Sequence, residues 1–237
     1  MPPPRIAALT LACTLLACAG GGDVPVDAGI AAAAAPPPEG SGRIEEFLPS
    51  VTLASGEKAS VHVTPDQMPW RIDVPLPKDA PQHASRRQGQ EAVISALREW
   101  ERALRTELPW FHLEFVEDDP EAPVRVVWKR RTVGPWSGFG APRARVRDGE
   151  VEAGGELVLA VRSCELCPTL DLDEVRLLAA HEFGHVLGLG HCHTCESAMS
   201  YDWQTRGRAF VTRVDVRAFV ALCAQPNPAV DELAAER

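Results

Sequence analysis

The sequence of 237 residues has no excess of positive charge. Its 24 lysines and arginines are outnumbered by 33 aspartates and glutamates, which gives a formal net charge of -9. Proteins that bind nucleic acids neutralise phosphates with clustered basic residues, so we expect no nucleic-acid partner. The sequence also has no N-terminal apolar run long enough to remain as a membrane span, because the run from Ile6 to Ala17 is too short to cross a bilayer. With 45% hydrophobic residues, the composition is that of a globular protein.

The first residues have the pattern of an export signal. Arg5 precedes the apolar run, and we expect the signal to cover residues 1–17. The run ends in Leu15-Leu16-Ala17-Cys18, which resembles the lipobox of bacterial lipoproteins. This resemblance implies cleavage before Cys18, lipidation of that cysteine and a membrane-anchored protein of the cell envelope or cell surface, held by more than one acyl chain. The alternative is an ordinary secretory signal in which Cys18 has no role.

The chain after the lipid site divides by composition. Residues 18–42 are rich in alanine, glycine and proline and have almost no large apolar side chain. Such a segment cannot bury enough surface to offset the entropy of ordering, so we expect a flexible tether. Residues 43–67 form an N-terminal segment, either a short prosegment or an extra strand. We expect the folded domain over 68–225 and a tail over 226–237.

Strand and helix patterns alternate through the folded part. Apolar residues recur at helical spacing from Ser85 to Glu107, and Asp171 with Glu174 predicts the start of a helix that runs to Leu187. This order predicts an α+β fold in which helices pack on a mixed, twisted sheet. The other expected elements are strands at Ser60–Val63, Trp70–Val74, Phe111–Val116, Val124–Trp128 and Glu156–Val161, a long loop from Thr132 to Gly155, and a last helix from Thr212 to Leu222.

One segment has the spacing of a metal site. His181 and His185 are four residues apart on a predicted helix, so both imidazoles project from one face, roughly 6 Å apart along its axis. Gly188 ends the helix and turns the chain, so that His191 returns as a third ligand. Three neutral histidines leave a fourth position open for water, which is typical of a catalytic zinc site. Glu182, next to the first ligand, can act on that water without binding the metal.

This pattern, followed by Met199, resembles the metzincin signature and its methionine-containing turn. The order of elements is also similar to the metzincin catalytic domain, and Phe210–Val216 resembles the start of the last helix in matrixins. Two features differ from matrix metalloproteinases. The chain has no Pro-Arg-Cys-Gly latency motif, and the loop before the zinc helix lacks the histidines and aspartates of their second zinc.

The resemblance implies a zinc-dependent endopeptidase that acts on proteins or peptides, with Glu182 as general base and Tyr201 near the zinc, where it stabilises the transition state. We expect one catalytic Zn²⁺ per chain, a monomer, and a substrate that adds to the strand Glu156–Val161. Trp203 and Gln204 are candidates for shaping the specificity pocket. The alternative function is a catalytically silent zinc-binding lipoprotein that serves as an adhesin or scaffold, although the intact Glu182 argues against it.

Four cysteines flank the zinc helix in two Cys-x-x-Cys pairs. They are Cys164, Cys167, Cys192 and Cys195. Cysteines after the third histidine are similar to those of archaemetzincins, where they bind a second zinc. Two interpretations therefore stay open: a structural zinc held by four thiolates, or disulfides, which an oxidising compartment favours. We expect Cys223 to be a buried free thiol and His193 to be a loop residue.

Overall fold

The structure is a computed structural model, and it describes residues 42–44, 46–132, 137–162, 164, 166–201 and 210–233. The expected leader, Cys18 and nearly all of the tether lie outside these residues, as do Trp203 and Gln204. None of the helices among the described residues has the length and apolar character that a membrane span requires.

A five-stranded mixed sheet forms the base of the fold, in the spatial order β4-β3-β5-β7-β6. Four of its strands are parallel, and β6 pairs antiparallel to β7 at one edge. The α+β fold with a mixed sheet is therefore confirmed. The strands are β3 (Trp70–Asp73), β4 (Leu113–Val116), β5 (Val124–Lys129), β6 (Gly138–Arg147) and β7 (Glu150–Ala160).

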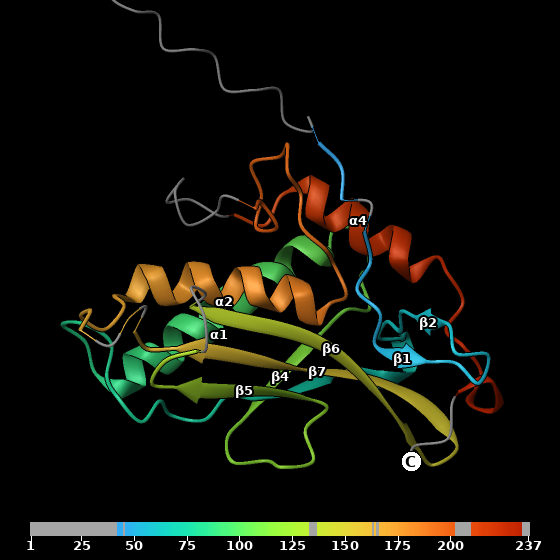
Figure 1. The fold of residues 1–237 in the computed structure, drawn as a ribbon, viewed down its shortest axis with the longest axis horizontal. Coiled ribbons are helices and arrows are strands. Elements are labelled where there is room, and N and C mark those ends of the chain that lie inside the picture. Colours follow the sequence, from blue (N-terminus) through green and yellow to red (C-terminus); the bar gives the residue numbers. More distant parts are fainter. Residues whose placement is uncertain are drawn as a thin grey trace, which may run out of the picture. The chain divides into compact units, whose positions relative to one another are not determined.

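Among the residues that the structure describes, three α-helices accompany the sheet, namely α1 (Arg86–Leu104), α2 (Leu172–Val186) and α4 (Arg213–Cys223). Figure 1 shows α1 and α2 side by side on one face of the sheet. Each helix begins at the residue that the sequence predicts, because Ser85, Asp171 and Thr212 accept a main-chain N–H at their N-termini. All three helices are confirmed, with ends that differ by at most three residues.

Aromatic side chains join these helices to the sheet. Phe183 of α2 lies 6.1 Å from Trp70 of β3 and 6.4 Å from Trp100 of α1, between ring centroids. Phe111 continues the cluster to Phe219 of α4 at 5.9 Å. The Trp100 indole N–H donates to the carbonyl of Ala180 at 2.8 Å. Burial of these rings and this hydrogen bond together hold α2, and so the residues it carries, in one orientation on the sheet.

The long loop expected from Thr132 to Gly155 is wrong. Apart from residues 133–136, which lie outside the description, it consists mainly of a hairpin made by β6 and the first half of β7. Asp148 and Gly149 both have positive φ, 52° and 83°, which suits a tight two-residue hairpin turn. A proline rules out a strand only where the main-chain N–H at its position would have to bond to a neighbouring strand, because proline has no N–H. Pro142 lies in an edge strand, at a position whose N–H would point away from β7.

The position of Pro142 follows from the pairing register. Ala160 donates to the carbonyl of Ser137 at 2.8 Å, so this pair is hydrogen-bonded, and bonded pairs then alternate along the strands. Odd-numbered residues of β6 turn their main-chain groups towards β7, and even-numbered residues turn theirs to the free edge. The free edge of the sheet therefore belongs to β6. The expected strand Glu156–Val161 is part of β7, which lies between β5 and β6. The prediction that a substrate adds to this strand is therefore wrong, because both edges of β7 are already paired.

The expected strand Ser60–Val63 is also wrong. The strands that precede it among the described residues are the two-residue pair β1 (Val51–Thr52) and β2 (Lys58–Ala59). Val61 and Val63 are buried, but the N–H of Val61 bonds to the Ser50 hydroxyl rather than to a strand. Near the C-terminus, Asn227 exchanges two hydrogen bonds with the main chain of His62. Short 3₁₀ helices at η1 (Pro65–Gln67) and η2 (Val230–Glu232) complete these segments.

Candidate metal centre

The helix α2 carries two of the three candidate ligands. Asp171 and Glu174 bond each other's main-chain N–H groups at 2.8 Å and so fix its start. At its other end Gly188 has φ of +89°, and Leu189 donates to the carbonyl of Gly184 at 3.0 Å. A residue with a side chain is strained at that φ, so glycine lets the chain reverse here. The reversal brings His191 back towards the helix.

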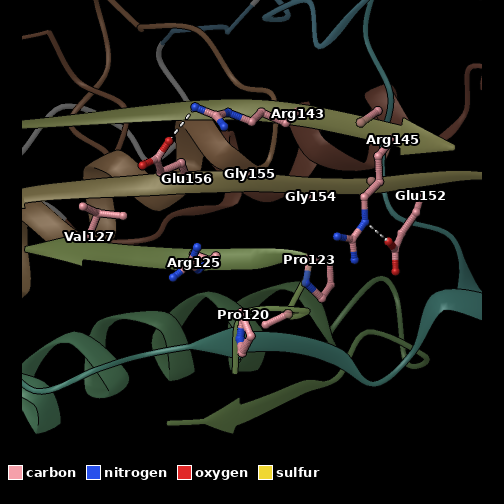
Figure 2. A pocket seen from close by; sticks show the side chains of 13 residues that line it. Pro120, Pro123, Arg125, Val127, Arg143, Arg145, Glu152, Gly154, Gly155 and Glu156 are labelled. Carbon is pink, nitrogen blue, oxygen red and sulfur yellow. Dashed lines mark hydrogen bonds and ion pairs between the residues drawn. The ribbon is translucent and has the colours of Figure 1, made fainter. Parts of the chain in front are cut away.

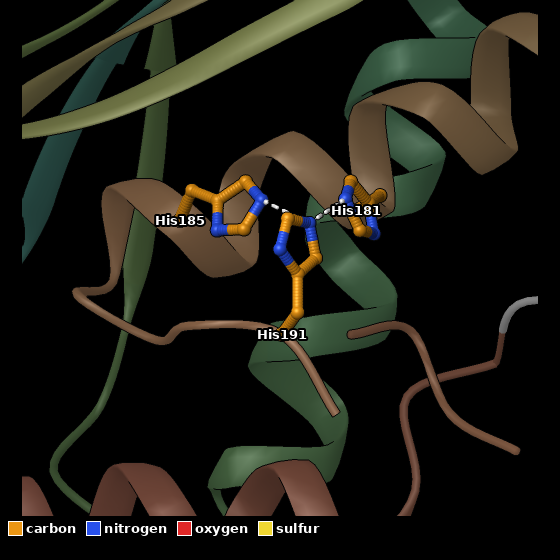
Figure 3. A group of neighbouring side chains, drawn as sticks. All are labelled: His181, His185 and His191. Carbon is orange, nitrogen blue, oxygen red and sulfur yellow. Dashed lines mark hydrogen bonds between the residues drawn. The ribbon is translucent and has the colours of Figure 1, made fainter. Parts of the chain in front are cut away.

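The three imidazoles converge on one point, as Figure 3 shows. Nε2 of His191 lies 3.2 Å from Nε2 of His181 and 3.2 Å from Nε2 of His185. On the far sides of two rings, Nδ1 of His181 meets the carbonyl of Ala198 and Nδ1 of His185 meets the carbonyl of Leu189, both at 2.8 Å. A carbonyl oxygen only accepts, so each Nδ1 carries the proton. Both Nε2 lone pairs are therefore directed at the common point.

These distances suit a tetrahedral metal ion. Ligands about 2.0–2.1 Å from zinc in tetrahedral directions are separated by about 3.3 Å from one another, close to the spacing of the Nε2 atoms. Backbone carbonyls that hold the second ring nitrogen are typical partners of metal-binding histidines. The three histidines could therefore hold a metal, and three imidazoles are a donor set that zinc accepts.

Burial keeps the ligands neutral. Together with the positive charge that neighbouring histidines would carry, it lowers the pKa of His181 to about 3 and of His185 to about 4. Burial also lowers the pKa of His191, helped by His193 and opposed by the nearby Glu46 carboxylate. A neutral imidazole is the form that binds a metal, so these residues are ready to bind at neutral pH.

Glu182 lies between the histidines and the start of the edge strand β6. It is buried, with 6% of its surface exposed. Burial raises its pKa to about 8 in the protein without a metal, against the effect of a hydrogen bond from the main-chain N–H of Gly140. A nearby divalent cation would favour the ionised form. A carboxyl whose pKa lies near neutrality can both take and give a proton.

Two glycines of β6 make room for Glu182. A Cβ on Gly138 would lie 2.8 Å from the Glu182 carboxylate, and one on Gly140 would lie 2.0 Å from its carbonyl oxygen. The sequence interpretation missed both residues, because it assigned them to a loop. The signal that could have found them is Gly138-Phe139-Gly140 at the start of a segment that pairs with a neighbouring strand.

The structure places Met199 and Tyr201 beside the histidines. Met199 is fully buried, and its sulfur packs so closely on Gly184 that a Cβ there would lie 2.0 Å from it. It therefore lies beneath the helical turn that separates His181 from His185. Tyr201 is 51% exposed, and its ring lies edge-on to that of His191 at 5.4 Å. His193, which is exposed, stacks its ring on that of Tyr201, with 5.2 Å between the ring centroids.

The flanking cysteines form two disulfides, Cys164–Cys167 and Cys192–Cys195. In this structure their thiolates are therefore not assembled around a metal. The second disulfide closes the loop that follows His191, where Cys192 donates to the carbonyl of Met199 at 2.7 Å. Cys223 is a free thiol, partly buried, and burial raises its pKa to about 12.

A cavity of about 770 Å³ opens over the histidines. Part of its wall comes from an unexpected source, the N-terminal residues Glu46 and Leu48. Leu48 donates to the carbonyl of Gly188, and Gly190 donates to the carbonyl of Glu46, both at 2.8 Å. The sequence gives no motif for this contact, since about 140 residues separate the two segments. The other lining residues are Lys129, Arg131, Thr132, Ser137, Gly138, Phe139, Gly140, Val158, His181, Glu182, His185, Gly190, His191 and Tyr201.

A second cavity, of about 320 Å³, lies over β5, β6 and β7 and is drawn in Figure 2. Its wall carries arginine and glutamate side chains that are paired with one another. Arg143 bonds Glu156 and Arg145 bonds Glu152, each at 2.5 Å. Nothing in this arrangement points to a metal or a catalytic group.

Comparison with known proteins agrees with the geometry over one part of the chain. The family model for matrixins, peptidase family M10, matches residues 168–223. This range contains α2, all three histidines, Met199 and α4. No curated protein matches the chain. The matrixin match and the histidine triad together fit a metzincin-like zinc metalloprotease.

Proposed function

We propose that this protein is a zinc-dependent endopeptidase. The observation that carries the proposal is the convergence of three neutral imidazoles, at tetrahedral spacing, beside a buried carboxyl in one open cavity. A structural zinc site uses four protein ligands, whereas a site with three leaves a position for water and substrate. Within the described residues, only the triad of His181, His185 and His191 offers such a group of ligands.

The chain's own residues have separate roles in hydrolysis. Zinc at the triad would supply a water of lowered pKa and would polarise the substrate carbonyl. Glu182 takes the proton of the attacking water and delivers it to the nitrogen of the leaving amine. The hydroxyl of Tyr201, on the side chain next to His191, is the candidate donor to the oxyanion. His181 and His185 are kept in position by the carbonyls that their Nδ1 atoms contact.

The substrate lies extended along the free edge of β6 in this proposal. That edge turns out the N–H of Gly138 and the carbonyls of Gly138, Gly140 and Pro142, while the N–H of Gly140 is bonded to Glu182. An extended peptide can add to an exposed edge through main-chain hydrogen bonds, which suits a protease because every peptide offers them. Pro142 has no N–H and only accepts, which also limits pairing between edges of two copies.

The proposal is tested with the full, zinc-loaded chain and its Glu182→Gln variant, incubated with a diverse peptide library. Mass spectrometry then reads the cleaved bonds with and without a zinc chelator. We expect internal peptide bonds to be cut only when zinc and Glu182 are both present, with zinc still bound to the variant. Glu91→Gln, an exposed change on α1, is the matched control and should cleave as the parent does. An inactive zinc-loaded parent would instead favour the scaffold function.

We also propose that the chain is exported and anchored by lipid at Cys18. The support is the order of charge, apolar run and Leu-Leu-Ala-Cys at residues 15–18. Expression in a bacterium fed a labelled fatty acid tests it. Label should enter the parent and the Cys223→Ala variant but not Cys18→Ala. Label in Cys18→Ala would refute the assignment.

The metal content of the purified protein tests how many zinc sites it has. We propose one zinc per chain, at the triad, with the two disulfides intact. In the mature chain, from which Cys13 is removed with the signal and in which Cys18 is lipidated, we expect one zinc atom and, under denaturing conditions, one reactive thiol, that of Cys223. Two zinc atoms and five thiols would favour the four-cysteine site instead.

A further inference from the structure

The cavity over the triad carries opposite charges at its two ends. At the first end, three residues of neighbouring chain segments lie in one row across the sheet. Lys129 pairs with Ala160, and Ala160 is bonded to Ser137. Lys129 and Arg131 line the cavity there. Further along the same edge come Gly138 and Gly140 with Glu182, and then His185, which a Cβ on Gly140 would touch at 2.8 Å. The basic residues therefore lie on the side of Glu182 that faces the start of β6.

The other end is acidic. Beyond His185 the chain turns at Gly188, and the N–H of Gly190 donates to the carbonyl of Glu46 at 2.8 Å. The two main chains are so close that a Cβ on Gly190 would lie 2.9 Å from the Cβ of Glu46. Glu46 is exposed and lines the cavity. The main chain of Glu46 is bonded to the loop that carries His191, so its side chain starts from a fixed position at this end of the cavity.

The two ends differ in their surroundings. At the basic end the cavity passes around the start of β6 to the side chains of Phe139 and Val158, and Phe139 is 59% exposed. An acidic side chain of a bound peptide can place its methylenes on this apolar floor and its carboxylate near Lys129. At the acidic end, a lysine or arginine of the peptide would extend past His191 to Glu46. Opposite potentials at two ends of a cleft favour one direction of a charged ligand over the other.

We infer that this cavity selects and orients peptides by charge, taking a basic side chain at the Glu46 end and an acidic side chain at the Lys129–Arg131 end. The inference rests on the proposed function in that the bound molecule is a peptide. It adds a substrate class: segments with a lysine or arginine on one side of the central residues and an aspartate or glutamate on the other. A bound strand has one direction, so the same charges in reverse order fit poorly.

The experiment uses two peptide sets of equal composition, one with arginine before and glutamate after the central residues, and one with the order reversed. Binding to the full, zinc-loaded Glu182→Gln chain is measured by fluorescence anisotropy, and cleavage by the parent is measured separately. We expect one order to bind about tenfold more tightly than the other at low salt. Salt should reduce this difference, because exposed charges are screened.

Charge-reversal variants identify the residues responsible. Glu46→Lys should remove the preference for arginine and leave that for glutamate, and Lys129→Glu should do the converse. Matched controls with the same changes of net charge are Glu57→Lys and Lys58→Glu, which are exposed and do not line the cavity. They should keep both preferences. Circular dichroism and zinc content of each variant show whether it is folded.

The outcomes separate the two proposals. Equal binding of both peptide orders, or an order preference that survives both Glu46→Lys and Lys129→Glu, would overturn the charge inference even if cleavage is intact. Binding with the expected order preference, but no cleavage by the parent chain, would support the inference and reject the endopeptidase.

Discussion

The two faces of the sheet place charged groups in opposite settings. On the face that α2 covers, Glu182 and two ligands of the triad are buried, and their pKa values move far from the ordinary ones. On the other face, Arg143 and Glu156 are ion-paired but partly exposed, with 67% and 29% of their side chains accessible. Both faces carry polar groups on neighbouring strands, yet only one of them has the features of a reactive site.

Burial, rather than the number of charges, shifts the pKa values of the groups in this site. Removing water raises the free-energy cost of an uncompensated charge, so burial favours the neutral form of a carboxyl or an imidazole. A neutral imidazole can bind a metal, and a carboxyl with a raised pKa can exchange a proton with a substrate. In the exposed pairs each charge has both a partner and water around it, so its ionised form is the ordinary one and the pair contributes little free energy. Substitutions that break this contrast should have large effects on the covered face and small effects on the open one.

The largest effect should come from removing a ligand. His185→Ala leaves two imidazoles and breaks the hydrogen bond to Leu189. We expect zinc affinity to fall by about a thousandfold or more, about 4 kcal/mol. Competition with a chelating dye measures this. Exposed His83→Ala is the control. Unchanged affinity in His185→Ala would contradict the triad.

The aromatic packing that holds α2 on the sheet should be nearly as sensitive to substitution. Phe183→Ala removes a fully buried ring that contacts Trp70 and Trp100. We expect the free energy of unfolding to fall by about 3–5 kcal/mol, as for other large aromatic deletions in cores. Urea unfolding at fixed zinc concentration measures it. A loss below about 1 kcal/mol would mean that α2 is held mainly by other contacts.

The close approach of the edge strand to α2 gives a third test. Gly140→Ala places a Cβ 2.0 Å from the carbonyl oxygen of Glu182, and a main-chain atom cannot move aside easily. We expect a loss of stability of about 1–3 kcal/mol from overpacking. Cleavage should fall as well, because Glu182 is displaced. Unfolding curves and peptide cleavage should change together, and a stable variant with full activity would argue against this packing.

The sequence separation between interacting residues decides how much of the fold and of the candidate site can be predicted from the sequence. The helices and the triad depend on residues within one or two turns, such as Asp171 with Glu174 or His181 with His185, and the sequence indicates them directly. The hairpin at 138–160 was missed because its glycines and Pro142 suit a loop when the partners are unknown. Their role depends on the pairing of β6 with β7 and on the packing of β6 against α2, which begins about 30 residues further along the chain. The Glu46 contact with Gly190 is of the same kind.

A smaller effect is expected at the start of α2, where the helix reaches solvent. Asp171→Ala removes the acceptor for the N–H of Glu174, a bond of 2.8 Å. Loss of a helix cap costs about 1 kcal/mol. Thermal unfolding should show this decrease, while zinc affinity should stay within twofold because the ligands are more than two turns away. A large loss of zinc would mean that the start of the helix is coupled to the triad.

The smallest effect should come from the open face. Arg143→Ala breaks the ion pair with Glu156. Arg143 lies on β6, only three residues after Gly140. Because the guanidinium is largely exposed, we expect a change in unfolding free energy within about 0.5 kcal/mol, and unchanged zinc affinity and cleavage. A cycle with Glu156→Ala isolates the interaction between the two side chains. A coupling above about 1.5 kcal/mol would show that pairs on this face are stronger than exposure implies, and the contrast between the two faces would then have to rest on the metal site alone.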